Sequence, residues 1–179
     1  MVARHSHSVS PVTLTFTEQV SPGIFTFGFP RDFPFKAGQV IGIALAEDGA
    51  RHLYNICSGE DDGAVWIATG TGITPFYSML RSGKADGKVL IHGNRYLEQF
   101  HFYDDFHSAM GEDYIRCCSG ETSDGVFHGR VTRYLTGHPG LDPDIKYYLC
   151  GSAEMVVDTR DILIDQGIPF DQIISEIYF

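Results

Sequence analysis

The chain has 179 residues, a formal net charge of −10 at pH 7, 43% hydrophobic residues and 20% charged residues. This composition is typical of a folded globular protein, and the length allows one large core or two small ones that share an interface. The acidic balance argues against nucleic acid or an anionic membrane as a partner. A solvated acidic surface that aids solubility is the alternative explanation of the charge.

Targeting signals and metal motifs are not found in the sequence. The first ten residues lack the apolar stretch of a secretory signal, and no apolar run approaches the roughly 20 residues of a membrane span. The four cysteines form no C-x-x-C pair, and the eight histidines lack the spacing of metal ligands. We therefore expect a cytoplasmic protein without a disulfide framework, an iron–sulfur cluster or a metal site.

The first 62 residues are predicted to form a short antiparallel β domain. Apolar and polar side chains alternate in four short segments, and turn sequences rich in proline, glycine and acidic residues separate them. The predicted strands are Val12–Thr17, Ile24–Phe29, Val40–Leu45 and Arg51–Ser58. Short strands at this spacing are typical of a β-barrel or a sandwich.

Residues 63–179 are predicted to form an α/β domain with a parallel sheet and crossover helices. From Gly63 onward, apolar runs alternate with segments of helical period, which is the pattern of such a sheet. The predicted strands are Ala64–Thr69, Lys88–His92, Tyr114–Cys118, Lys146–Cys150 and Gln172–Tyr178.

Two helices have clear start and stop signals. In the first, Thr74 is expected to cap the helix, Pro75 to occupy its first position and Gly83 to end it. The last helix is expected to start near Ser152, to stop at Gly167 and to bury one apolar face. That face comprises Met155, Val156, Thr159, Ile162 and Leu163.

A glycine-rich loop between the first α/β strand and its helix predicts a phosphate site. Gly70 and Gly72 would let the backbone approach a pyrophosphate, and the helix N-terminus would supply N–H groups with a positive dipole. We expect Gly72→Val to abolish dinucleotide binding by filling the pyrophosphate space. The alternative is that the glycines serve only a tight strand-to-helix turn.

A second loop, Cys150–Met155, also joins a strand to a helix start. Because ligands of open parallel sheets lie beyond the carboxyl ends of the strands, both loops are expected to line one crevice. Cys150 would point into that crevice, or alternatively would pack as a small buried hydrophobe.

Five motifs in order along the chain resemble those of the ferredoxin–NADP reductase superfamily. They are Phe35–Gln39, Tyr54–Ser58, Gly70–Phe76, Cys150–Met155 and the ending Glu176–Phe179. The resemblance implies a flavin-binding β-barrel followed by an NADP-binding α/β domain. It also implies hydride transfer between nicotinamide C4 and flavin N5, with electrons passed on to an acceptor.

The resemblance also implies roles for individual residues. Tyr54 would pack on the FAD ring. The catalytic residues would be Asn55, Cys150 and Glu176. Asn55 takes the place of a serine that bonds near flavin N5, Cys150 matches a cysteine near the nicotinamide, and Glu176 matches a carboxylate near the C-terminus. Arg51 and Ser58 would contact FAD, and a terminal aromatic residue, Tyr178 or Phe179, would cover it. The alternative for the terminal aromatic pair is core packing. The dinucleotide would be bound by Gly70, Thr71, Gly72, Thr74, Pro75, Arg95, Arg130, Gly151, Glu154 and Met155.

Coenzyme choice between NADP and NAD is left open by the sequence. Arg95 resembles an arginine near the phosphates, and Arg130 resembles one of two arginines that hold the 2′-phosphate of NADP. The segment expected to supply the other arginine has the sequence Ser119-Gly120-Glu121. Only a modest NADPH preference is therefore expected, and Gly120→Arg is expected to increase it.

The β domain is shorter than the resemblance leads one to expect. His52 stands where the family has an arginine, and Ser58 runs almost directly into the first α/β strand, without the further barrel strands that hold the flavin pyrophosphate. The leading hypothesis is a flavin-dependent NAD(P)H oxidoreductase. The alternative is an NAD(P)-binding regulatory or sensor module that has lost stable flavin binding.

Two expectations about partners follow from charge and from the short barrel. The acidic chain favours a small-molecule acceptor, or a protein acceptor that docks through a local basic or apolar patch. A half-barrel with an open edge favours a homodimer that completes it, and a monomer with weak flavin binding is the alternative.

Overall fold

The computed structural model describes residues 11–21, 24–28, 30, 39–43, 52–56 and 63–178. In the N-terminal part, two antiparallel strand pairs are described. Strand β1 (Phe16–Ser21) pairs with β2 (Ile24–Gly28), and β3 (Gln39–Ile43) pairs with β4 (His52–Ile56). The predicted barrel and the division of the chain at residue 62 stay predictions, because they depend on residues outside this description.

One N-terminal strand was misplaced by the sequence pattern. The strand predicted at Val12–Thr17 begins only at Phe16, and Val12 and Leu14 are 56% and 45% exposed. Pairing with β2 sets the position, since the register runs from Phe16 opposite Gly28 to Ser21 opposite Ile24. The other three predicted strands are confirmed within the described residues; their ends at residues 29, 44–45, 51 and 57–58 lie outside them.

Residues 63–178 contain a six-stranded parallel sheet, as the sequence predicts. Its strand order is β10-β9-β5-β6-β7-β8. The strands are β5 (Ala64–Thr69), β6 (Lys88–Asn94), β7 (Tyr114–Cys118), β8 (Phe127–His128), β9 (Lys146–Ser152) and β10 (Ile173–Tyr178). Every neighbouring pair in this sheet is parallel. The five predicted strands are all present, and the two-residue strand β8 is additional.

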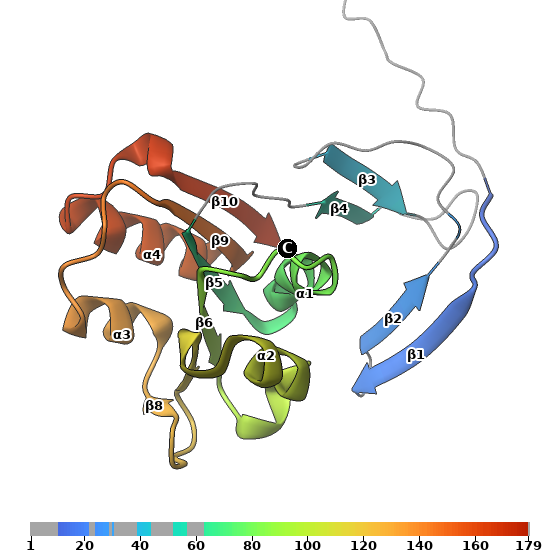
Figure 1. The fold of residues 1–179 in the computed structure, drawn as a ribbon, viewed down its shortest axis with the longest axis horizontal. Helices are drawn as coiled ribbons and strands as arrows, with labels where there is room; N and C mark the ends of the chain where they lie inside the picture. The colour runs from blue at the N-terminus through green and yellow to red at the C-terminus, as the bar shows by residue number, and fades with distance from the viewer. Residues whose placement is uncertain are drawn as a thin grey trace, which may run out of the picture.

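Helices cover both faces of the sheet (Figure 1). They are α1 (Ile73–Arg81), α2 (Tyr103–Met110), α3 (Val131–Gly137) and α4 (Ala153–Asp165). Short 3-10 turns lie at Gly70–Gly72, Leu97–Gln99, Gly111–Asp113 and Phe170–Gln172. One buried cluster joins the sheet to α1 and α2 around Trp66, and a second joins its other face to α3 and α4 around Leu149.

The connections place a switch point between β5 and β9. The helices after β5 and β6 cover one face, whereas the helix after β9 covers the opposite face. At such a point the two loops leave neighbouring strands in opposite directions and open a crevice at the carboxyl edge of the sheet. The fold therefore places the two loops singled out in the sequence next to each other.

The helix ends confirm some sequence signals and correct others. Helix α1 begins at Ile73 after Gly72, so Thr74 is not its cap and Pro75 is its third residue. The 3-10 turn at Gly70–Gly72 continues directly into the helix, so α1 begins at Ile73, before the predicted first position at Pro75. Ser152 caps α4 by accepting a hydrogen bond from the Met155 N–H, as expected from the sequence.

Helices α1 and α4 both end at a glycine with a left-handed backbone conformation. Gly83 after α1 and Gly167 after α4 have φ of +71° and +91°. In each case the glycine N–H and the next N–H donate to the last turn of the helix. These hydrogen bonds to the last carbonyl groups of the helix require a residue with a left-handed backbone conformation, which glycine adopts without strain. Both predicted stops are thus confirmed.

No helix within the described residues is long and apolar enough to cross a membrane. Within the same residues, no group of three or more His, Cys, Asp or Glu side chains is arranged to hold a metal ion.

Candidate functional site

A cavity of about 290 Å³ opens at the carboxyl edge of the sheet, beside the switch point. Its walls come from the loops after β5, β6, β7 and β9 and from the first turns of α3 and α4. They are formed by Thr69, Gly70, Gly93, Asn94, Arg95, Cys117, Ser119, Arg130, Val131, Thr132, Ser152, Glu154, Met155 and Asp158. The expectation that the two glycine-containing loops line one crevice is confirmed.

Of the two glycines in the loop after β5, Gly70 is the one that faces open space. Its φ is +55°, a left-handed conformation that side chains rarely adopt, and a Cβ built on it would meet no atom within 4 Å. Since Gly70 also lines the cavity, its backbone is where a ligand can approach closely. Its N–H donates to Asn94 Oδ1 at 3.3 Å, so this loop is tied to the end of β6.

Gly72 has a different reason to be glycine. A Cβ at this position would lie closer than 3.0 Å to the carbonyl carbon and oxygen of Cys150 and to the nitrogen of Gly151. The residue is buried and lets the 3-10 turn after β5 pack on the end of β9. The expected clash of Gly72→Val is therefore with the protein backbone, which corrects the reason given from the sequence, a clash with pyrophosphate.

A partly buried polar network is connected to the Gly70–Gly72 turn through Asn94. Asn94 Nδ2 donates to the Gln99 carbonyl at 3.0 Å and lies 2.9 Å from His92 Nε2. On the other side of the ring, His92 Nδ1 lies 3.0 Å from the Tyr114 hydroxyl. Because Asn94 Oδ1 accepts from Gly70, its amide nitrogen is the donor to Nε2, so we infer that the ring proton is on Nδ1 and is donated to Tyr114.

The imidazole of His92 is held neutral. Its side chain is fully buried, and this burial, helped by His101, lowers the pKa of His92 from 6.5 to about 3. Burial likewise raises the pKa of the Tyr114 hydroxyl. A neutral ring has one donor and one acceptor nitrogen, which matches the two partners that the network supplies.

Asn94→Ala is expected to weaken both the fold and the loop. The change removes partners from Gly70, His92 and Gln99, and leaving buried polar groups without partners costs about 1–3 kcal/mol. Urea denaturation should show this loss in the free energy of unfolding. Ser119→Ala, which truncates another cavity residue, is the control and should leave stability within about 0.5 kcal/mol of the parent. An Asn94→Ala protein as stable as this control would contradict the supporting role.

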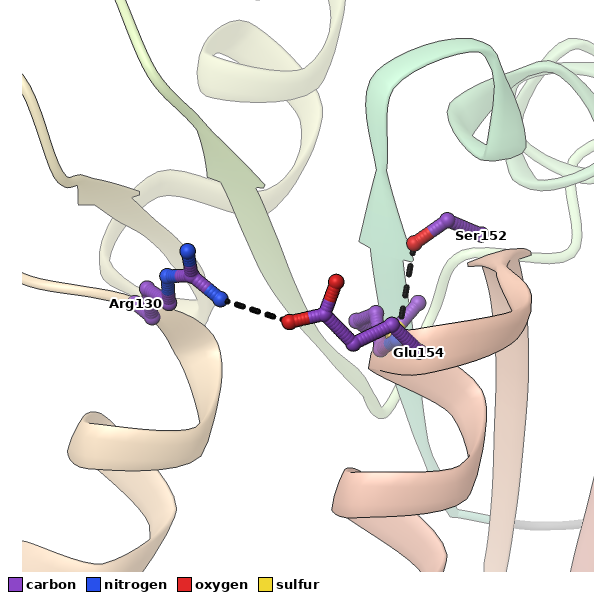
Figure 2. Close-up of polar contacts among 4 residues, drawn as sticks. Arg130, Ser152 and Glu154 are labelled. Carbon is purple, nitrogen blue, oxygen red and sulfur yellow. Dashed lines mark hydrogen bonds and ion pairs between the residues drawn. The ribbon is translucent and has the colours of Figure 1, made fainter.

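An ion pair crosses the mouth of the cavity. Arg130 Nη1 lies 3.1 Å from Glu154 Oε1, and the two side chains are 70% and 72% exposed. Arg130 precedes the first residue of α3, and Glu154 lies in the first turn of α4, so the pair spans the gap between the two helices (Figure 2). Ser152, also labelled there, caps α4 next to the pair.

Backbone hydrogen bonds continue the pairing of β6 and β7 beyond the strands. The Ser119 N–H donates to the Asn94 carbonyl, and the Gly120 N–H donates to the Arg95 carbonyl at 2.8 Å. A Cβ at Gly120 would lie 2.5 Å from the same Arg95 oxygen. Gly120→Arg would therefore displace the Arg95 backbone, and its effect on the NADPH preference stays a prediction.

The residues expected at the site fall into three groups. The cavity is lined by Gly70, Arg95, Arg130, Glu154 and Met155. Five others are not among the lining residues: Thr71 and Gly72 in the 3-10 turn after β5, Thr74 and Pro75 in the first turn of α1, and Gly151 in β9. Tyr54 and Asn55 lie in β4, Glu176 and Tyr178 lie in β10, and Arg51, Ser58 and Phe179 lie outside the described residues.

Cys150 is buried at the end of β9. Its side chain is 1% exposed and belongs to the cluster around Trp66, on the face covered by α1 and α2. It is not among the residues that line the cavity. Its role beside the nicotinamide stays a prediction, as do the other roles carried over from the resemblance.

Several cavity residues were not singled out by the sequence pattern. Asn94, Ser119 and Asp158 all line the cavity, and Asn94 accepts a hydrogen bond from the Gly70 N–H. The position of Asn94 directly after a predicted strand was the available signal, since polar residues at carboxyl ends of parallel strands face the ligand crevice. The spacing of Asp158 could also have indicated it, because it lies four residues after Glu154 and therefore on the same face of α4.

The fold and the cavity define a nucleotide-binding α/β domain of the doubly wound kind. The family model described as "Oxidoreductase NAD-binding domain" matches residues 66–161. The chain therefore belongs to the oxidoreductase NAD-binding domain family, within the ferredoxin–NADP reductase superfamily.

Similar proteins agree with this assignment. Ferredoxin–NADP reductase B of Sorangium cellulosum is 29% identical over 154 residues, which are 76% of this chain and 63% of that protein. The chain thus spans less than two thirds of the curated relative. A cytochrome P450 reductase from Amycolatopsis has a TM-score of 0.75 at 17% identity, over 93% of this chain and 68% of that one.

A ferredoxin NADP⁺ reductase from Neisseria gonorrhoeae, solved with bound FAD and NADP, has a TM-score of 0.73 at 22% identity. The match covers 94% of this chain and 98% of that one. At such identities these two structures bear on the fold alone.

Proposed function

We propose that this chain is an NAD(P)H-dependent flavin oxidoreductase of the ferredoxin reductase type. The observation that carries the proposal is the cavity at the switch point, which combines an open glycine backbone at Gly70 with the guanidinium groups of Arg95 and Arg130. A glycine without a Cβ lets a phosphate approach the backbone closely, and arginines bind phosphates through charge-assisted hydrogen bonds. In this proposal residues 63–179 bind the dinucleotide and residues 1–62 bind FAD.

The described residues form a cavity whose size and charge suit the phosphate-bearing part of a dinucleotide. A cavity of about 290 Å³ is comparable with the lower end of small-molecule sites, about 300 Å³, and its walls carry both apolar and charged groups. Gly70 leaves room for a phosphate, and Arg95 and Arg130 supply the positive charge. The FAD contacts expected from Arg51, Ser58 and Phe179 lie outside the described residues.

In the proposed mechanism, the flavin and nicotinamide supply the hydride chemistry when bound, and the chain supplies position. Asn94 fixes the Gly70 turn, and Arg95 and Arg130 would hold the phosphates of a bound dinucleotide. Cys150 and Glu176 lie opposite each other in the pairing of those strands, where they are proposed to shape the nicotinamide site. The acceptor is proposed to be a small molecule or a protein that docks through a local patch, because Ser152–Phe179 carries six acidic side chains and one arginine.

The experiment that tests the proposal is anaerobic mixing of the purified chain, supplied with FAD, with NADPH or NADH. We expect FAD to be retained near stoichiometry through desalting and its absorption bands to bleach on mixing. Binding of NADP⁺ or NAD⁺ without any retained FAD would contradict the enzyme and would support the alternative, a nucleotide-binding regulatory or sensor module. The short link between Ser58 and β5 is the observation that favours this second candidate.

A further inference from the structure

The mouth of the cavity carries equal numbers of positive and negative side chains. Arg95 and Arg130 come from the ends of β6 and β8, whereas Glu154 and Asp158 lie one turn apart on α4. All four are exposed and all four line the cavity. A site that binds only phosphate would gain from the arginines alone, so the two carboxylates need an explanation.

The position of this charged corner identifies the part of a dinucleotide that it would meet. In doubly wound sheets the pyrophosphate lies at the first strand-to-helix loop, and the adenosine ribose lies near the end of the next strand. Here the first loop contains Gly70, and the next strand, β6, ends at Asn94 beside Arg95. The corner formed by Arg95, Ser119 and Arg130 therefore faces the ribose 2′ position, where NADP carries a phosphate and NAD carries a hydroxyl.

Glu154 opposes a 2′-phosphate in two ways. It already holds the Arg130 guanidinium at 3.1 Å, so a phosphate must compete for that group (Figure 2). Its own negative charge would also repel a phosphate that approached Arg130. A ribose hydroxyl meets neither penalty, because a carboxylate accepts a hydrogen bond from it.

We infer that Glu154 is a specificity-determining residue of the proposed coenzyme site, where it occupies Arg130 and lowers the preference for the 2′-phosphate of NADPH over NADH. The inference rests on the proposed function and adds to it a residue that acts against the arginines. Asp158, on the same face of α4, acts in the same direction at longer range.

The test is calorimetric titration of the full chain with two adenosine fragments, 2′,5′-ADP and 5′-AMP. Neither fragment requires flavin or turnover, so the readout is independent of activity. Since an exposed ion pair is worth up to about 1 kcal/mol, Glu154→Gln should raise the affinity for 2′,5′-ADP roughly twofold to fivefold. The affinity for 5′-AMP should stay level or fall, and the gain should shrink with added salt.

Two further variants make the result specific. Asp165→Asn removes the same charge from the other end of α4, outside the cavity lining, and should leave both affinities unchanged. The double variant Glu154→Gln/Arg130→Gln should lose the gain, because the released guanidinium is no longer there. Equal changes for both fragments, or the same gain in Asp165→Asn, would overturn the inference while leaving the proposed function standing. If neither fragment binds the parent chain, the proposed function itself fails, and the inference fails with it.

Discussion

Gly72→Ala is expected to destabilise the protein by about 3 kcal/mol, whether or not a nucleotide is present. The new methyl group would lie inside contact distance of the Cys150 carbonyl group and the Gly151 nitrogen. Backbone atoms of a central strand cannot rotate away as a side chain can, so the turn after β5 and the end of β9 would have to separate. Thermal or urea denaturation of the nucleotide-free chain measures this loss.

Gly70→Ala is the informative comparison, because this position is open. Its left-handed φ costs an alanine about 1–2 kcal/mol, but the added methyl meets no protein atom within 4 Å. It projects from a residue that lines the cavity. We therefore expect a folded protein with a smaller loss of stability and a clear loss of affinity for NADP⁺.

Gly137→Ala at the end of α3 is the control, since its Cβ would also meet nothing within 4 Å and its φ is not positive. It should be neutral or slightly stabilising. If Gly72→Ala is as stable as Gly137→Ala and fails only in binding NADP⁺, the ligand-contact explanation from the sequence is right and the packing explanation is wrong.

Gly70 and Gly72 show which features of a loop a sequence pattern can predict and which it cannot. A strand, two glycines and a helix start correctly predicted a turn at the carboxyl edge of a parallel sheet. The pattern could not distinguish the glycine that faces the cavity from the one that packs on Cys150. That difference depends on β9, which is about 80 residues away along the chain and adjoins β5 only in the folded sheet.

Long apolar runs gave the most reliable predictions of the fold. Strands β5 and β7 have the predicted bounds, because buried parallel strands are apolar on both faces and flanked by polar turns. The two-residue strand β8 was too short to give a pattern. The first strand was misplaced since alternation alone did not fix its partner, and pairing with β2 moved it toward the turn.

The sequence predicted which loops form the site, but it did not predict the side-chain contacts between them. The ion pair between Arg130 and Glu154 joins residues 24 apart in sequence, and the contact of His92 with Tyr114 joins residues 22 apart. Neither separation has a periodicity that a local pattern can reveal. Such pairs arise from strand order, which places the ends of β6, β7 and β9 around one cavity.

His92 makes the stability of the domain dependent on pH. The folded protein holds the ring neutral down to a pKa of about 3, whereas the unfolded chain binds the proton near the ordinary value of 6.5. Between these values the unfolded state carries more protons, so stability is complete above pH 6.5 and falls as the pH decreases toward 3. Each pH unit in this window costs about 1.4 kcal/mol for one fully shifted group.

We therefore expect the parent chain to lose about 2 kcal/mol of unfolding free energy through His92 between pH 6.5 and pH 5, measured by urea denaturation. Burial also lowers the pKa of His101, which adds a loss of the same sign. His92→Gln keeps a side chain that can bond to Asn94 and Tyr114 but cannot take up a proton. Its stability should fall less steeply over this range.

The control is His107→Gln, which removes an exposed imidazole from α2 and leaves the buried network intact. This variant should keep the acid dependence of the parent, whereas His101→Gln should reduce it only in part. If His92→Gln and the parent lose the same free energy between pH 6.5 and pH 5, then His92 is not the buried neutral base inferred from the network. The hydrogen bonds that tie it through Asn94 to the Gly70–Gly72 turn would then have to be reassigned, because a protonated ring donates from both nitrogens and cannot accept from the Asn94 amide.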